Sequence, residues 1–203
     1  MTNEISPTPC TCCGAEQSDK PDAGRRSVLT AGALALSALA IPGAVLAQSA
    51  AVRKPEPGDK LAFMLGDRTG QEVKPDDVKV GAEPVLAYPL DPSGKVLLAK
   101  ANLLTVVRLS ADQLQPASAK NAADGIVAFS SLCTHYGCPI TTLHPDKTQI
   151  VCNCHGSIFD AANRGAVIQG PATRRLAMLP LTLKDGAIVV DGKFDGPLGP
   201  PTS

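Results

Sequence analysis

After residue 60, the hydrophobic positions of the chain fall into short runs separated by polar residues and turn formers. Many of these runs are rich in Val, Ile and Leu, and several alternate apolar with polar positions, which is typical of β-strands. Asp185-Gly186 lies between two of the runs and is a strong signal for a two-residue hairpin turn. We therefore predict strands at residues 61–65, 84–90, 103–109, 126–129, 149–151, 157–159, 166–168, 176–183 and 187–190.

A helical period of apolar positions is scarce in the same part of the chain. Residues 110–124, rich in Ala and polar side chains, predict a loop or a short helix. The pattern therefore predicts an all-β fold of antiparallel strands, with enough residues for one domain and a sizeable core. We expect this domain at 61–195, after a linker at 48–60 and before a flexible tail at 196–203 that is rich in Pro and Gly.

Residues 1–47 have the pattern of an export signal. Arg25-Arg26 precedes an apolar, Ala-rich run at 27–47, which is typical of a Tat signal that sends a folded protein to the periplasm. The small residues around Ala47 resemble a cleavage site, whereas the run itself is long enough to span a bilayer. Two outcomes remain open: a cleaved signal with a soluble periplasmic product, and an uncleaved anchor in the inner membrane.

The charge balance narrows the class of partner. Lys and Arg number 19, as do Asp and Glu, and no long basic run occurs, so we expect no nucleic-acid partner. Arg174-Arg175 is predicted to be a solvated pair, with docking of an acidic partner as the alternative. No general base, nucleophile or substrate pocket is evident, so the sequence predicts no independent catalytic site.

Two six-residue boxes carry the chemistry of the chain, CTHYGC at 133–138 and CNCHGS at 152–157. They contain four of the seven cysteines and two of the three histidines. Together they offer two thiolates and two imidazoles, which suit tetrahedral zinc and also a [2Fe–2S] cluster with two His ligands on one iron. The Cys-x-His spacing is tighter than the usual zinc pair, and the two remaining cysteines could cross-link the boxes.

The two boxes resemble the two-box motif of Rieske iron–sulfur proteins, and Gly170-Pro171-Ala172 resembles the proline loop of that family. The resemblance implies one [2Fe–2S] cluster per chain, in a cluster-binding subdomain at about 131–172 that is inserted into a larger antiparallel β base. It implies that Cys133 and Cys152 bind the inner iron and that His135 and His155 bind the outer iron. It also implies a disulfide between Cys138 and Cys154. Ser157 would donate its hydroxyl to a bridging sulfide, and Pro171 would cover the cluster.

Two positions depart from the pattern of high-potential Rieske proteins. Phe159 stands where those members carry a Tyr whose hydroxyl bonds to a ligand sulfur. Hydrogen bonds to cluster sulfur stabilise the reduced state, so we expect a lower potential here. Tyr136 stands at the tip where quinol-oxidising complexes usually carry Leu, and it alters the docking surface beside the first His ligand.

The resemblance implies one-electron transfer. With the export signal, it favours the small iron–sulfur subunit of a periplasmic oxidoreductase, similar to that of arsenite oxidase, with a larger redox subunit or a c-type cytochrome as partner. The alternative is the Rieske subunit of a membrane quinol:cytochrome c reductase, with quinol as a further partner. Tyr136 and Phe159 count against that alternative. A non-redox zinc-binding module is a third and less favoured reading.

Overall fold

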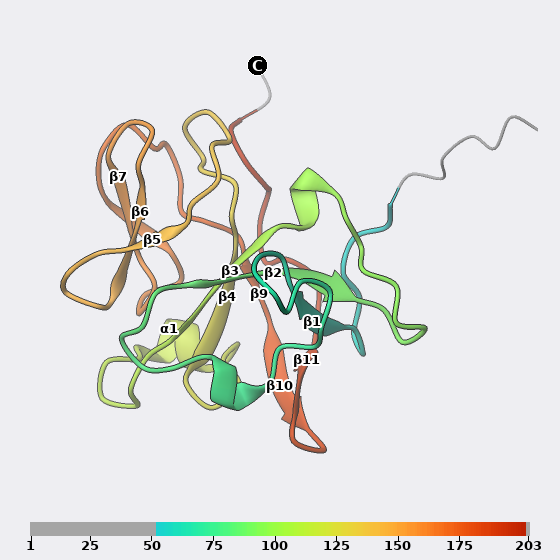
Figure 1. The fold of residues 1–203 in the computed structure, drawn as a ribbon. Coiled ribbons are helices and arrows are strands. Elements are labelled where there is room, and N and C mark those ends of the chain that lie inside the picture. Colours follow the sequence, from blue (N-terminus) through green and yellow to red (C-terminus); the bar gives the residue numbers. More distant parts are fainter. Residues whose placement is uncertain (1–51, 202–203) are drawn as a thin grey trace, which may run out of the picture. The chain divides into compact units, whose positions relative to one another are not determined.

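The computed structural model describes residues 52–201, which fold almost entirely into antiparallel β-structure (Figure 1). The predicted all-β fold class is therefore confirmed. The strands form a five-stranded sheet, a four-stranded sheet and a separate two-stranded hairpin. The short helical pieces of this range are α1 (Pro116–Ala119) and two 3₁₀ turns, Pro75–Asp77 and Lys100–Asn102.

The five-stranded sheet provides the base of the domain. In spatial order its strands are β1 (Lys60–Phe63), β2 (Val85–Leu90), β3 (Leu104–Arg108), β4 (Ile126–Ser130) and β9 (Met178–Leu179). All five residues of β4 are buried. Because successive side chains of a strand point to opposite faces, Ile126 and Ala128 enter one hydrophobic core while Val127 and Phe129 enter another. The strand that leads to the first box is thus held between two cores.

The hairpin of β10 (Leu181–Lys184) and β11 (Ala187–Val190) packs its apolar face into the first of these cores, with Leu181, Ile188 and Val190. The predicted turn residues connect the two strands. Asp185 has φ 51° and Gly186 has φ 74°, as a tight two-residue hairpin turn requires.

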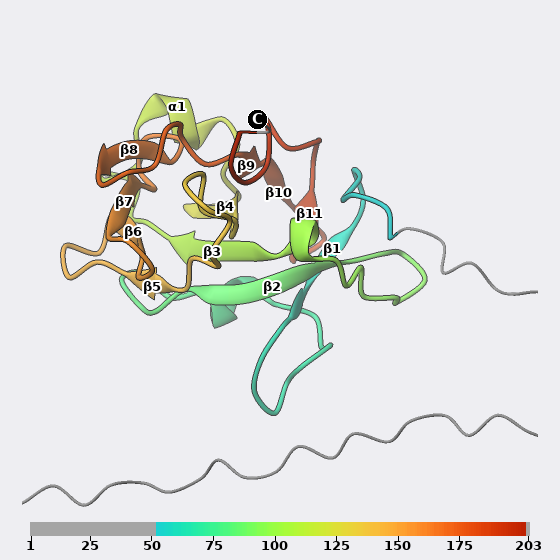
Figure 2. The same cartoon turned by 90° about the horizontal axis from the view of Figure 1, so that it is seen from above.

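The four-stranded sheet carries the second box. Its strands follow the chain in order: β5 (Thr142–Leu143), β6 (Gln149–Cys152), β7 (Ser157–Asp160) and β8 (Ala166–Gln169). Figure 2 shows this sheet beside the ends of β3 and β4, away from β1 and β11. Ile150 and Phe159 are cross-strand partners, and both enter the second core with Phe129. The core shared with β4 therefore attaches this sheet to the base.

The prediction of one strand at residues 176–183 is wrong. That apolar run divides at Pro180 into β9 and β10, which belong to different sheets. Proline has no N–H to donate to a ladder, and the next amide, of Leu181, donates instead to the carbonyl of Asn121 at 3.0 Å. Strand β5 was not predicted, because two residues are too short to show a period.

Within residues 52–201, no helix has both the length and the hydrophobicity needed to cross a membrane. The predicted export signal at 1–47 and the first four residues of the predicted linker, 48–51, lie outside the described residues.

Candidate metal centre

The two boxes fold into matching turns that follow strands of two different sheets. The first box follows β4, and the second connects β6 to β7. In each box, the amide of a Gly donates to the carbonyl of the Cys four residues earlier: Gly137 to Cys133 at 2.8 Å, and Gly156 to Cys152 at 3.0 Å. Both glycines have φ 70°, a left-handed conformation that favours Gly. The glycine of each box therefore closes the turn that carries its ligands.

A disulfide between Cys138 and Cys154 joins the two turns, with a Cα–Cα distance of 6.6 Å. The other two box cysteines, Cys133 and Cys152, are free thiols, and each is 1% exposed. The Cys152 sulfur lies within 4.8 Å of both disulfide sulfurs. Burial, and then a hydrogen bond with the Cys133 thiol, raises the pKa of Cys152, so a metal that binds this thiol would displace its proton.

The two box histidines lie together on the outer side of the thiols. The ring centroids of His135 and His155 are 4.7 Å apart, with the rings nearly perpendicular. His155 is exposed and His135 is half-buried. The Nδ1 atom of His135 is buried and has no hydrogen-bond partner within the described residues, so its lone pair is available to a ligand.

These residues fit a [2Fe–2S] cluster. Two buried thiols from different turns can bind an inner iron, and two imidazoles nearer the surface can bind an outer one. The orphaned nitrogen of His135 would be unfavourable without such a partner, because buried polar atoms are normally paired. The structure thus pairs the two predicted thiol ligands with each other and the two predicted imidazole ligands with each other, on two turns that the disulfide joins.

The predicted proline loop, Gly170–Ala172, follows β8 and covers the second box. The amide of Ala172 donates to the Ser157 hydroxyl at 3.1 Å, and Ser157 is fully buried. A hydroxyl both accepts and donates, so Ser157 retains a proton for a further acceptor such as a sulfide. Gly170 approaches so closely that a Cβ atom there would lie 2.5 Å from the Cα of Ser157. Pro171 itself is exposed at the tip of the loop.

Phe159 and Tyr136 occupy opposite environments around the centre. Phe159 is fully buried in the core that also contains Cys133 and Cys152. Tyr136 is 72% exposed, and its ring lies 4.4 Å from that of His135 and 5.7 Å from that of His155. Tyr136 is therefore the aromatic side chain that a molecule approaching these imidazoles would meet.

Sequence reasoning missed the partners of two residues beside the centre. The hydroxyl of Thr134, inside the first box, donates to the carbonyl of Arg174 at 2.6 Å. The prediction that Arg174-Arg175 is a solvated pair is wrong, because Arg174 donates to the carbonyl of Gly199 and Arg175 binds Asp195. The one signal in the sequence was the position of the two arginines, which follow the proline loop after one residue, Thr173.

A sequence profile of the Rieske [2Fe–2S] domain matches residues 72–180, more than half of the chain. The chain belongs to the Rieske family, and the predicted [2Fe–2S] cofactor is confirmed. Its function is electron transfer through that cluster. The assignment of each ligand, hydroxyl and cover residue remains a prediction that the geometry accommodates.

Two curated relatives are both called cytochrome bc1 complex Rieske iron–sulfur subunit. The relative from Streptomyces coelicolor is 33% identical over 192 residues, which cover 87% of this chain and 53% of that protein. The relative from Streptomyces lividans is 34% identical over 160 residues, which cover 72% of this chain and 94% of that protein. The chain therefore spans about half the length of one relative and nearly all of the other.

Among solved structures, the chain is similar to the cyanobacterial plasma membrane Rieske protein PetC3 from Synechocystis PCC 6803. The TM-score is 0.38 at 28% identity, over 58% of this chain and 94% of that one.

Proposed function

We propose that this protein is the Rieske subunit of a quinol:cytochrome c reductase and passes single electrons from quinol toward a c-type cytochrome. The observation that carries the proposal is the likeness to two subunits of cytochrome bc1 complexes, one of them over 94% of its length. This likeness favours the alternative of the sequence analysis over the small subunit of a periplasmic oxidoreductase.

The geometry supports transfer at the imidazole side of the centre. The bound cluster supplies a one-electron couple of raised potential. His155 is exposed and His135 half-buried, whereas both free thiols are buried against the core. Donor and acceptor would therefore approach the two histidines, and an imidazole at the surface can exchange a proton as well as conduct an electron.

We further propose that the protein works in the periplasm after Tat export, either soluble or anchored through residues 27–47. Support comes from Arg25-Arg26 and from the disulfide between Cys138 and Cys154, which requires an oxidising compartment to persist. The intact mass of the protein from its native host tests the two forms. A mass lacking about 47 residues would indicate cleavage, and the full mass would indicate an anchor.

Tyr136 favours a second candidate, the small iron–sulfur subunit of a periplasmic oxidoreductase. Its exposed phenol lies against the His135 ring and would change how a quinol reaches that imidazole. The partners in this case would be a larger redox subunit and a c-type cytochrome.

Isolation of the tagged full-length chain from native membranes separates the two candidates. A quinol:cytochrome c reductase predicts co-purification of b- and c-type haem, and loss of quinol-dependent cytochrome c reduction in a deletion strain. Co-purification with a water-soluble oxidoreductase that lacks b-type haem, with quinol oxidation unaffected, would reject the first candidate in favour of the second. A colourless protein without the reduced Rieske EPR signal would reject both and favour zinc.

A further inference from the structure

The segment Gly196–Pro200, which we call the C-terminal strap, lies across the first box. A Cβ atom at Gly137 would lie 3.4 Å from the Pro200 ring, and one at Gly199 would lie 3.7 Å from the Leu132 side chain. Leu132 and Gly137 flank the ligands of the first box. The sequence predicts a flexible tail from residue 196, yet the strap is in contact with the part of the chain that would hold the cluster.

Arg174 connects the strap, the proline loop and the first box. Its carbonyl accepts the hydroxyl of Thr134 at 2.6 Å, and its Nη2 donates to the carbonyl of Gly199 at 2.7 Å. Thr134 is 1% exposed and lies between the predicted ligands Cys133 and His135. Arg174 therefore connects the first box, through Thr134, with the strap, through Gly199.

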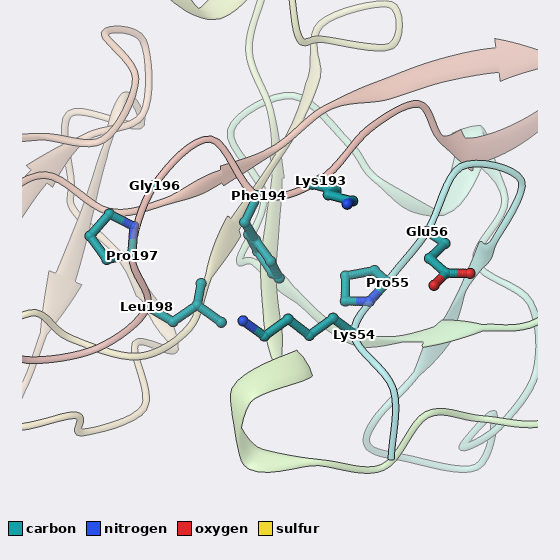
Figure 3. A pocket seen from close by; sticks show the side chains of 8 residues that line it. All are labelled: Lys54, Pro55, Glu56, Lys193, Phe194, Gly196, Pro197 and Leu198. Carbon is teal, nitrogen blue, oxygen red and sulfur yellow. The ribbon is translucent and has the colours of Figure 1, made fainter. Parts of the chain in front are cut away.

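A pocket lies beside the first three residues of the strap. Gly196, Pro197 and Leu198 line a pocket of about 420 Å³ together with Phe194 and residues 54–56 (Figure 3). The residue before the strap, Asp195, is held firmly by Arg164 and Arg175. Within the described residues, the strap itself receives its side-chain hydrogen bond from Arg174, which donates to the Gly199 carbonyl.

We propose that Arg174 and the C-terminal strap form a clamp that positions the first box around the cluster and excludes water from it. Arg174 is a positioning residue, since it acts on the ligands through Thr134 and the strap. The proposal goes beyond the proposed function: it depends on the cluster and not on which redox complex contains the chain.

The charge of Arg174 gives the clamp a second, measurable effect. Reduction adds one negative charge to the cluster, and a nearby cation in a partly buried site stabilises that state. The guanidinium of Arg174 is part-buried, and its Nε atom is fully buried and unpaired within the described residues. Removal of this cation should therefore lower the midpoint potential as well as loosen the clamp.

Three full-length variants test the clamp in the purified, cluster-loaded protein. Arg174→Gln should lose its visible cluster absorbance about tenfold faster in the presence of an iron chelator, because a charge-assisted hydrogen bond is lost. The midpoint potential of Arg174→Gln should also fall. Arg174→Lys should recover most of the wild-type potential but should still lose its cluster absorbance faster than wild type. Arg108→Gln is the matched control, since Arg108 is also part-buried and binds Asp124 and the carbonyl of Pro75 on the base.

Thr134→Val provides a test that leaves Arg174 in place. It removes the hydrogen bond to the Arg174 carbonyl while keeping a β-branched side chain of similar size, so it should also accelerate cluster loss, by severalfold. In the double variant with Arg174→Gln, the two effects should be less than multiplicative, because both act on one clamp. The proposal is overturned if both single variants lose the cluster at the wild-type rate, or if Arg108→Gln is equally affected. Failure of Arg174→Gln to assemble a cluster, with Thr134→Val unchanged, also overturns it.

Discussion

His135 and His144 provide a direct comparison at the scale of single residues. His135 lies beside His155, and its buried Nδ1 has no hydrogen-bond partner among residues 52–201. His144 instead lies in a surface turn where its Nδ1 is 3.3 Å from Asp146. The two histidines are nine residues apart in the same segment of the chain. Their surroundings, and not their residue type, separate a predicted ligand from a turn residue.

We predict that His135→Ala prevents assembly of the cluster, while His144→Ala leaves it intact. Alanine removes a donor that the outer iron requires, and no other imidazole in the described residues lies within reach except His155. The reduced EPR spectrum and the iron content measure the outcome. A normal Rieske spectrum in His135→Ala would reject the ligand assignment.

We also predict that Phe159→Tyr raises the midpoint potential. Phe159 shares a buried core with Cys133 and Cys152, so a new hydroxyl there enters the environment of the inner iron, and a hydrogen bond to sulfur stabilises the reduced state. Phe129→Tyr is the control, because Phe129 is fully buried in the same core but lies on the base strand β4. Redox titration should show a higher potential for Phe159→Tyr alone; equal potentials in both variants would contradict the prediction.

At the scale of elements, the proline loop depends on close contact between backbones. Gly170 has φ 90° and lies against the backbone of Gly156 and Ser157, and two residues later Ala172 donates to the Ser157 hydroxyl. The turn after β8 can cover the second box because the residue that crosses it has no side chain. A glycine here serves both the conformation and the space that the loop requires.

Gly170→Ala should therefore displace the proline loop and accelerate cluster loss. The new Cβ would lie 2.5 Å from the Ser157 Cα, in addition to the strain of a positive φ, which costs about 1–2 kcal/mol. Gly66→Ala is the control, since Gly66 has φ 83° but nothing lies within 4 Å of its Cβ position. Gly170→Ala should lose its cluster absorbance to a chelator faster, and unfold at a lower temperature, than Gly66→Ala. Equal effects in the two variants would mean that only the strain of the positive φ matters.

At the scale of the whole domain, Asp195 connects segments that lie far apart in the sequence. Its carboxylate accepts hydrogen bonds from Arg164, Arg175 and the amide of Met178. Burial alone would raise the pKa of Asp195, but the hydrogen bonds from Arg175, Met178 and Arg164 outweigh it and lower the pKa. The turn between β7 and β8, the strand β9 and the residue before the strap are thus held by one charged group.

Asp195→Asn should lower the free energy of unfolding near neutral pH by about 1–3 kcal/mol, because hydrogen bonds to a charged group are lost. A lowered folded-state pKa contributes stability that is complete above the unfolded value of about 3.9 and is lost as the pH falls below it. The variant should therefore lose less stability than wild type below about pH 4. Denaturant unfolding across pH measures this. Asp124→Asn should change stability much less, because the carboxylate that pairs with Arg108 is itself exposed.

Much of the domain could be predicted from local pattern. The continuous apolar run at 126–129 predicted a strand, and Asp185-Gly186 predicted its hairpin, because a two-residue turn needs only its own positive φ angles. The division at Pro180 was missed. Proline alone does not reveal that the amide of Leu181 has another partner in Asn121, from a loop 60 residues earlier in the chain.

The sequence by itself determined the chemistry of this protein, because the ligand types, the glycines of the turns and the spare cysteines all lie within two boxes of six residues. Only the tertiary structure decided what surrounds that chemistry. Thr134 meets Arg174 across 40 positions, and Arg174 meets Gly199 across 25. Such pairs carry no periodic signal, since they depend on how the two sheets pack around their shared core.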